Sequence, residues 1–106
     1  MVNRFEVYLV NLDPDPRGEA KNSRPGVVVS PDELNRHVET VIIAPLSSTR
    51  TPYPTRVRTE FLNAERFIIL DQIRTVDKSR LVKKIGEIPE RSKKETLERL
   101  AEMFAE

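Results

Sequence analysis

The sequence predicts a mainly β protein with helices (an α+β chain), built as a compact, mostly antiparallel β-barrel. Short apolar segments alternate with turns rich in Pro, Gly and Asn over most of the 106 residues, which is typical of small barrels. Residues 92–106 differ, because their apolar side chains recur at helical spacing. The length fits one domain, residues 1–106.

The first two expected strands flank a long loop. Residues 6–12 (EVYLVNL) are apolar on both faces, like a strand that is covered on both sides. Residues 13–23 are rich in Pro, Asp, Gly and Asn and predict the loop. The second strand is expected at residues 26–29. A short inserted helix is expected at residues 31–36, because Ser30 can cap it, proline suits its first position and acids favour its N-terminal end.

The middle of the chain predicts further short strands. Residues 40–45 (TVIIAP) read as a buried strand, and residues 46–54 as a second polar loop. Residues 55–59 (TRVRT) predict a strand with its arginines on one face. Residues 66–70 are apolar again, and residues 82–88 can form a last strand. Together with the first two, these segments predict roughly five to seven strands.

A terminal amphipathic helix is expected to follow the strands. Its apolar stripe, spaced i, i+3, i+4 and i+7, is formed by Leu97, Leu100, Ala101 and Phe104. Ser92 with Glu95 fits a capping box, although the helix can also begin nearer Pro89. The stripe predicts packing against the barrel or a second copy. The mixed charges on the other face differ from the basic face of membrane-binding helices.

The composition limits the possible chemistry. The chain has no cysteine, which excludes disulfides and thiolate metal sites and fits a reducing compartment. His37 is the only histidine, which excludes two-histidine catalysis and multi-histidine zinc sites. We therefore expect no metal and no other cofactor. The net charge of +1 indicates no partner, but basic residues outnumber acidic ones over residues 50–84. That excess can form either a phosphate-binding face or a solvated, salt-bridged surface.

No segment has the pattern of a targeting or membrane sequence. The N-terminal MVNRFEVYLVNLDP lacks the apolar core of a signal peptide. The longest apolar runs, such as VIIAPL and FIIL, are too short to cross a bilayer. We expect a soluble, cytoplasmic protein without membrane contact.

Carboxylates, hydroxyls and arginines gather in three loops at the ends of apolar segments, at residues 18–25, 45–49 and 71–75. These groups suit RNA cleavage by the RNA's own 2′-hydroxyl. Arginine matches phosphate oxygens with its planar fork, serine can donate to a phosphate oxygen, and a carboxylate can accept the 2′-hydroxyl proton. The same groups can equally be ordinary turn residues or a structural Arg–carboxylate pair.

Five segments carry a resemblance to a known family: EVYLVNLDP, GEAKNSRPGVVVSPDELN, TVIIAPLSS, YPTRV and LDQIRTVDKSRL. In this order and spacing, they resemble the MazF/PemK toxins of bacterial toxin–antitoxin systems over essentially the whole chain. The resemblance implies an SH3-like barrel that forms a homodimer. It also implies metal-independent, sequence-selective cleavage of single-stranded RNA to 2′,3′-cyclic phosphate and 5′-hydroxyl ends. The natural inhibitor would be a cognate antitoxin whose C-terminal segment occupies the RNA site.

The resemblance also assigns catalytic positions. The family's catalytic arginine falls on Arg24, its loop glutamate on Glu19, and its catalytic threonine on Ser47, which keeps a hydroxyl. One branch of the family uses a histidine and a further arginine. This chain has Gly18 and Ile69 at those two positions, so the Arg-plus-hydroxyl variant fits better. We expect Arg24 to stabilise transition-state charge, because a guanidinium stays protonated. Ser47 is expected to donate near the scissile phosphate, and Glu19 to act as a base or to orient Arg24.

Other residues are expected to contact RNA, namely Lys21, Ser48, Thr49, Arg50, Tyr53, Arg56, Gln72 and Arg74. Tyr53 can be a base-stacking platform beside two arginines, or a half-buried barrel aromatic. Asp71 can be catalytic, or it can be structural together with Arg74.

Two other functions are kept as alternatives. A relative with the same fold poisons DNA gyrase without catalysis, through its C-terminal end and a tryptophan there. This chain has no tryptophan, which argues against that mode. The second alternative is an inactive homologue that only binds, because Ser47 stands where the family has threonine.

Overall fold

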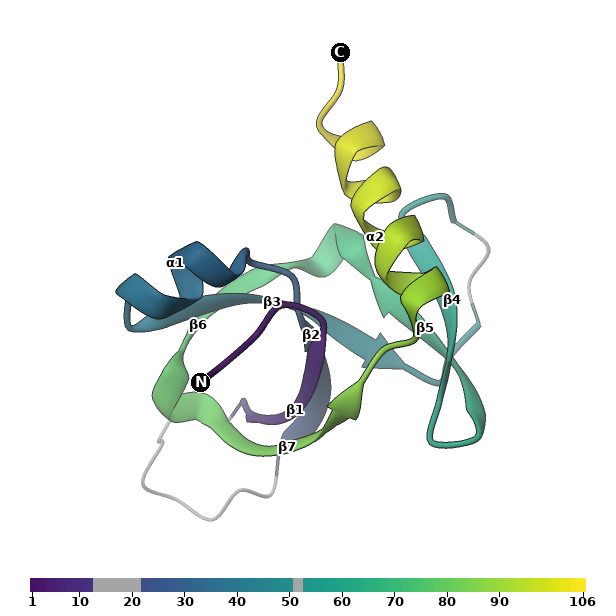
Figure 1. Ribbon diagram of the computed structural model, residues 1–106. Helices are drawn as coiled ribbons and strands as arrows, with labels where there is room; N and C mark the ends of the chain where they lie inside the picture. The colour runs from purple at the N-terminus through teal and green to yellow at the C-terminus, as the bar shows by residue number, and fades with distance from the viewer. Residues whose placement is uncertain (13–21, 51–52) are drawn as a thin grey trace.

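The computed structural model describes residues 1–12, 22–50 and 53–106 (Figure 1). The elements are β1 (Glu6–Asn11), β2 (Ser23–Val28), α1 (Asp32–His37), β3 (Thr40–Ser47), β4 (Arg56–Phe61), β5 (Ala64–Ile69), η1 (Leu70–Gln72), β6 (Arg74–Asp77), η2 (Lys78–Arg80), β7 (Leu81–Glu87) and α2 (Glu90–Met103). All strand pairs are antiparallel, and the sheet has the order β4-β5-β3-β2-β1-β7, with β6 also paired to β3.

The sheet curls around an apolar core, and the two helices lie on its outside (Figure 1). Fully buried core side chains come from strands along the whole sheet and include Val7, Val27, Ala44, Val57 and Ile68. The end of α2 projects beyond the barrel (Figure 1). The predicted mainly β, antiparallel barrel with a short inserted helix and a C-terminal helix is confirmed.

β2 begins earlier than the sequence predicts. The expected strand at residues 26–29 is observed as Ser23–Val28, so Arg24 and Pro25 belong to the strand. The reason is β1, whose Asn11 and Val10 pair with Ser23 and Arg24. A long-range partner therefore overrides the local loop signals of this segment.

β3 is also longer than predicted. The predicted end at residue 45 is wrong, because the strand continues to Ser47. Its first four residues pair with β6 and its middle residues, 43–45, with β2 on the other side, and its last two residues, Leu46 and Ser47, pair with Ile68 and Phe67 of β5. β3 is therefore the strand from which three neighbours diverge.

Ser30 does not cap the inserted helix as predicted. Pro31 is the N-cap residue of α1 and has no side-chain cap bond. Ser30 is buried, and its Oγ donates to Asn35 Oδ1 (2.5 Å) and accepts from the Ile42 amide (3.1 Å). The serine therefore ties α1 to β3.

The remaining strands follow the predicted order with different bounds. The strands expected at 55–59 and 66–70 are β4 and β5, joined by a two-residue turn in which Leu62 and Asn63 both have positive φ. β6 was not predicted, because most of its side chains are exposed and its apolar pattern is weak. It forms because β3 supplies a backbone partner for each of its residues.

The C-terminal helix begins at Glu90, with Pro89 as the N-cap residue, so the alternative start is confirmed and the capping box is wrong. Ser92 is instead buried, and its Oγ shares a hydrogen bond with Thr59 Oγ1 at 2.6 Å. The predicted stripe is partly wrong. Leu100 packs against the core together with Met103, whereas the other three stripe residues (Leu97, Ala101 and Phe104) are exposed.

Replacing Thr96 of this helix by valine is expected to stabilise the protein. The residue is fully buried against the barrel, and its Oγ1 has no hydrogen-bond partner in the part of the chain that the structure describes. Thr96→Val should therefore raise the free energy of unfolding in urea by about 1 kcal/mol, because it removes an unsatisfied polar atom. Thr59→Val is the matched control and should lower that free energy, because its hydroxyl is bonded. A loss of stability in Thr96→Val would contradict this account.

Replacing Gly86 of β7 by alanine is expected to destabilise the protein. Its φ is +155°, and a Cβ built there would lie 2.8 Å from Phe61 Cε1. Gly86→Ala should cost about 2 kcal/mol of unfolding free energy, from backbone strain and overpacking combined. Denaturant unfolding would measure the loss, and a Phe61→Leu background should reduce it. A loss below about 0.5 kcal/mol would show that the strand accommodates a side chain without strain.

Candidate active site

Arg24 lies near the start of β2 and Ser47 at the end of β3, where these two neighbouring strands cease to pair. β2 and β3 pair up to Gly26 and Pro45, and continuing this register by two residues sets Arg24 opposite Ser47. The ladder stops before reaching them, because the next residue of β2, Pro25, has no amide hydrogen to donate to β3. The two chains therefore separate at the point where the expected catalytic side chains begin.

On the other side of β3, the pairing strand changes at nearly the same point of the chain. β6 pairs with β3 as far as Arg74, which lies opposite Ile43. β5 then takes over at Leu46. The short helix η1, which ends at Gln72, occupies the chain between β5 and β6. This change of partner brings Gln72 and Arg74 to the part of β3 that leads into Ser47.

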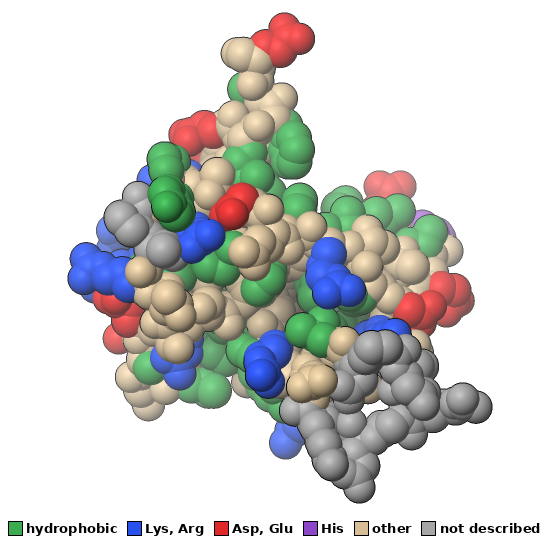
Figure 2. Space-filling view, turned by 180° about the vertical axis from the view of Figure 1, so that it is seen from behind, with side chains coloured by type: hydrophobic (Ala, Val, Ile, Leu, Met, Phe, Trp, Pro, Cys, Tyr) green, Lys and Arg blue, Asp and Glu red, His purple; other side chains and the backbone are tan. Residues whose placement is uncertain are grey.

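A cavity of about 810 Å³ lies where these strands diverge. Its polar lining consists of Arg24, Ser47, Ser48, Thr49, Arg56, Arg66, Gln72 and Arg74. Its apolar lining consists of Val10, Leu12, Pro25, Ile43, Pro45, Leu46 and Ile69. The described lining holds four arginines and no carboxylate, so the cavity favours an anionic ligand. Figure 2 shows the back of the molecule, where Lys and Arg side chains stand among hydrophobic and uncharged ones.

Arg24 has hydrogen-bond donors to spare. Its side chain is exposed, and its Nη1 donates to the Ser23 carbonyl oxygen at 3.1 Å. Within the described ranges, no carboxylate forms an ion pair with Arg24. A guanidinium has five N–H donors in a fixed fork, so most of them can reach a phosphate group.

The Ser47 hydroxyl is held in place by its own turn. Ser47 is half-buried, and its Oγ accepts a hydrogen bond from the Thr49 amide at 3.0 Å. An oxygen that accepts in this way keeps its own proton for donation. Ser48 and Thr49 follow directly and are exposed at the rim.

Arg56 has a different environment from Arg24, because Asp71 binds it. Its Nε and Nη2 donate to Asp71 Oδ1 (3.3 Å) and Oδ2 (3.5 Å), and Thr55 Oγ1 also donates to Oδ1 (2.9 Å). The hydrogen bonds from Arg56 and Thr55 lower the pKa of Asp71, so this carboxyl is ionised at neutral pH. The Arg56 guanidinium also lies over the Tyr53 ring, 5.0 Å from its centroid.

Not every predicted site residue lines this cavity. Glu19 and Lys21 lie outside the described residues. Arg50, Tyr53 and Asp71 are not among the lining side chains. Tyr53 and Asp71 nevertheless contact Arg56, which is a lining residue. His37 is the last residue of α1 and is exposed, as expected for a helix-end histidine.

Arg66 is a cavity residue that the sequence did not single out. It lies on β5 next to Phe67, which pairs with Ser47. Its only signal in the sequence was membership of the basic stretch 50–84. Choosing it from that stretch requires the pairing of β3 with β5, which joins segments that are far apart in the chain.

Neither a metal cluster nor a membrane-spanning helix is found in residues 1–12, 22–50 and 53–106. These residues contain no group of three or more His, Cys, Asp or Glu side chains that could hold a metal ion. None of their helices has both the length and the apolar content needed to span a bilayer.

Residues 3–104 match the family model of the PemK-like, MazF-like toxins of type II toxin–antitoxin systems. The chain belongs to this family. The MazF-like sequence is 35% identical over 101 residues to Endoribonuclease MazF of Staphylococcus saprophyticus, which covers 90% of this chain and 84% of that relative. The resemblance predicted from the five sequence segments is thereby confirmed.

Solved structures share the fold of this MazF-like toxin. An endoribonuclease in complex with its cognate antitoxin, from a mycobacterial species, has a TM-score of 0.82 at 25% identity and covers 96% of this chain and 93% of that one. A MazE–MazF structure from Deinococcus radiodurans has a TM-score of 0.78 at 21% identity, with coverage of 98% and 95%. The predicted SH3-like barrel of the family is confirmed by these matches.

Proposed function

We propose that this MazF-like toxin is an endoribonuclease that cleaves single-stranded RNA in a sequence-selective manner, with the 2′-hydroxyl of the RNA as the nucleophile. The observation that carries the proposal is the presence of Arg24 and Ser47 in the lining of one cavity whose described lining is cationic and free of carboxylates. The 35% identical relative, which is named an endoribonuclease, supports the same activity.

The proposed reaction is a transesterification at phosphorus. The 2′-oxygen forms a bond to the adjacent phosphorus and gives its proton to a base, while the bond from phosphorus to the 5′-oxygen breaks. The leaving 5′-oxygen takes up a proton. The products are a 2′,3′-cyclic phosphate and a 5′-hydroxyl, and the protein has to supply a cation, a hydrogen-bond donor and a base.

Arg24 and Ser47 suit two of these tasks. Arg24 can donate to the non-bridging phosphate oxygens, where negative charge develops as the 2′-oxygen adds. The Ser47 hydroxyl can donate to the phosphate or to the leaving oxygen, because its oxygen is already held by the Thr49 amide. Glu19 is proposed as the base, or as the group that orients Arg24, on the sequence pattern alone. None of these tasks requires a metal ion.

The remaining polar lining is proposed to hold the RNA on either side of the cleaved bond. Arg66, Arg74 and Gln72 suit backbone phosphates and base edges, and Ser48 and Thr49 suit hydrogen bonds at the rim. Arg50 and Lys21, which lie next to this region in the sequence, are proposed to add backbone contacts.

The toxin is proposed to act in the cytoplasm as a single-domain homodimer that a cognate antitoxin inhibits. The mycobacterial relative is in complex with its cognate antitoxin, and the Deinococcus structure contains MazE with MazF. The exposed apolar side chains of Leu97 on α2 and of Phe104 just after it provide surface for a second copy.

The test is cleavage of a long single-stranded RNA by the purified toxin in the presence of EDTA. We expect discrete cuts by the wild type and none by Arg24→Ala, whereas Arg58→Ala, which removes an exposed arginine outside the cavity, should cut normally. An inert wild type would overturn the proposal and leave the binding-only homologue. Inhibition of gyrase without RNA cleavage would favour the gyrase-poisoning alternative.

A further inference from the structure

Tyr53, Arg56 and Asp71 form a connected unit beside the cavity. The Arg56 amide donates to the Tyr53 carbonyl oxygen (3.0 Å), and the Leu70 amide donates to the Thr55 carbonyl oxygen (3.0 Å). These two backbone bonds set the start of β4 against η1, so that the Asp71 carboxylate faces the Arg56 guanidinium. Backbone hydrogen bonds therefore position the residues of this unit relative to one another.

Arg56 is not equivalent to Arg24 as a phosphate ligand. Its side chain is only 15% exposed, and two of its nitrogens are bound by one carboxylate. A phosphate approaching Arg56 would meet the negative charge of Asp71 as well as the guanidinium. The positive charge of Arg56 is thus largely neutralised by Asp71, whereas most N–H donors of Arg24 can bind a phosphate group.

The guanidinium has a second contact, which is the Tyr53 ring. The ring stacks against it by a cation–π interaction, and Tyr53 is nevertheless 58% exposed. One face of the ring is therefore fixed by the protein while the other can receive a flat ligand. Arg56 lines the cavity, so the ring that contacts it lies next to the cavity, beside the bound RNA of the proposed function.

We infer that Tyr53 is a stacking platform for one unpaired purine base of the RNA, with Arg56 and Asp71 as the residues that position it. The inference rests on the proposed RNA substrate. Stacking on an aromatic ring holds single-stranded bases, and a purine offers the larger surface. Asp71 is a positioning residue and not a catalytic one, since it acts on the ring through Arg56.

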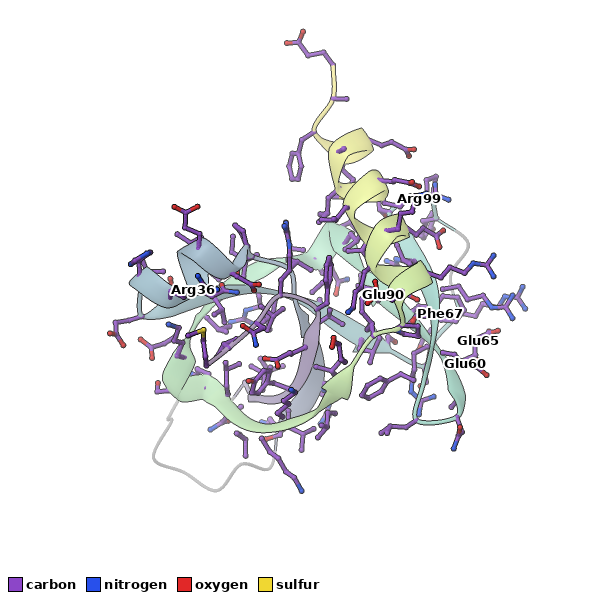
Figure 3. The ribbon with its side chains drawn as sticks, viewed as in Figure 1. Arg36, Glu60, Glu65, Phe67, Glu90 and Arg99 are labelled. Carbon is purple, nitrogen blue, oxygen red and sulfur yellow. The ribbon has the colours of Figure 1, made fainter. Side chains whose placement is uncertain are left out.

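The first experiment compares cleavage kinetics and cleavage maps of four toxins: wild type, Tyr53→Leu, Asp71→Asn and Glu65→Gln. Glu65 is the matched control, because it also pairs with an arginine of β4, the exposed Arg58, but lies on the outer side of the hairpin near Glu60 (Figure 3). We expect Tyr53→Leu and Asp71→Asn to raise KM about tenfold with kcat nearly unchanged, and to lose the same purine preference next to the cut. Glu65→Gln should match the wild type.

The second experiment separates this inference from the proposed function. In an Arg24→Ala background, binding of fluorescent 12-nucleotide oligoadenylate and oligouridylate is measured by anisotropy. The parent should bind oligoadenylate about fivefold more tightly, Tyr53→Leu and Asp71→Asn should abolish the difference, and Tyr53→Phe should keep it because the ring remains.

Each outcome decides the inference. An adenylate preference that is lost only in the Tyr53 and Asp71 variants supports the platform, even if the wild type proves unable to cleave RNA. Equal binding of the two oligonucleotides by the parent overturns it, as does a preference that survives Tyr53→Leu. A fall in kcat with unchanged KM in Asp71→Asn would instead make Asp71 part of the chemistry. Because Tyr53 is exposed, Tyr53→Leu decides the outcome even if Asp71→Asn does not fold.

Discussion

Replacing Arg24 by alanine should lower kcat for RNA cleavage by about 10²–10³-fold, the usual effect of removing a charge-stabilising donor from an active site. The exposed side chain makes one backbone hydrogen bond and no ion pair within the described ranges, so the fold should not depend on it. Single-turnover cleavage of a radiolabelled RNA measures the rate, and thermal unfolding checks that the variant is folded.

Arg24→Lys distinguishes planar recognition from simple charge. A lysine keeps the charge but replaces the fork of donors with a point charge, so most of the activity should still be lost. Lysine activity near that of the wild type would contradict a bidentate role for Arg24. Full activity in Arg24→Ala would contradict the assignment of the site itself.

Replacing Ser47 by alanine should lower kcat by about 10²-fold, which is at the low end for a positioned proton donor. The variant keeps the backbone of the turn but removes both the oxygen that accepts from Thr49 and the proton that can reach the leaving group. KM should change little, because Arg24 and the other cavity arginines remain. The measurement is again the single-turnover rate at saturating enzyme.

Ser47→Thr and Ser48→Ala are the matched controls for this serine. Threonine restores a hydroxyl and should keep activity within several-fold of the wild type. Ser48→Ala should leave kcat nearly unchanged, because Ser48 is exposed at the rim, follows the strand and is proposed only to bind RNA. A large loss in Ser48→Ala combined with an active Ser47→Ala would move the donor role to Ser48.

Most of the architecture can be predicted from local patterns of apolar and turn-forming residues in the sequence. Apolar segments separated by Pro- and Gly-rich turns gave the strands, and helical spacing gave α2. The errors fall where a distant partner decides. Arg24 is in a strand because β1 pairs with it, β3 extends to Ser47 because β5 pairs with it, and β6 exists only as a partner of β3.

The candidate site was predictable to a different extent. Arg24 and Ser47 are predicted by family resemblance, and the structure independently places both in the lining of one cavity. Arg66 was missed, because its neighbour's pairing with Ser47 is invisible in the sequence. The Arg56–Asp71 ion pair was missed for the same reason, since it depends on the contact between η1 and the start of β4.

The stripe on α2 shows a limit of periodicity itself. Spacing identified the helix, but the face that meets the barrel also contains polar Ser92 and Thr96, which are buried. Apolar Phe104, which follows the last residue of α2, is 72% exposed, whereas Met103 just before it packs against the core. Which side of a short amphipathic helix is buried thus depends on its contacts with the barrel, which the spacing of apolar residues alone does not determine.

The most direct test of the central claim uses an RNA oligonucleotide in which only the nucleotide 5′ to a mapped cut carries a 2′-deoxy sugar. If the 2′-hydroxyl is the nucleophile, the toxin should cut the all-ribose control in EDTA to a 2′,3′-cyclic phosphate and a 5′-hydroxyl, and should leave the deoxy linkage intact. Cleavage of the deoxy linkage at a comparable rate would contradict the account, because water or a protein group would then have to attack the phosphorus.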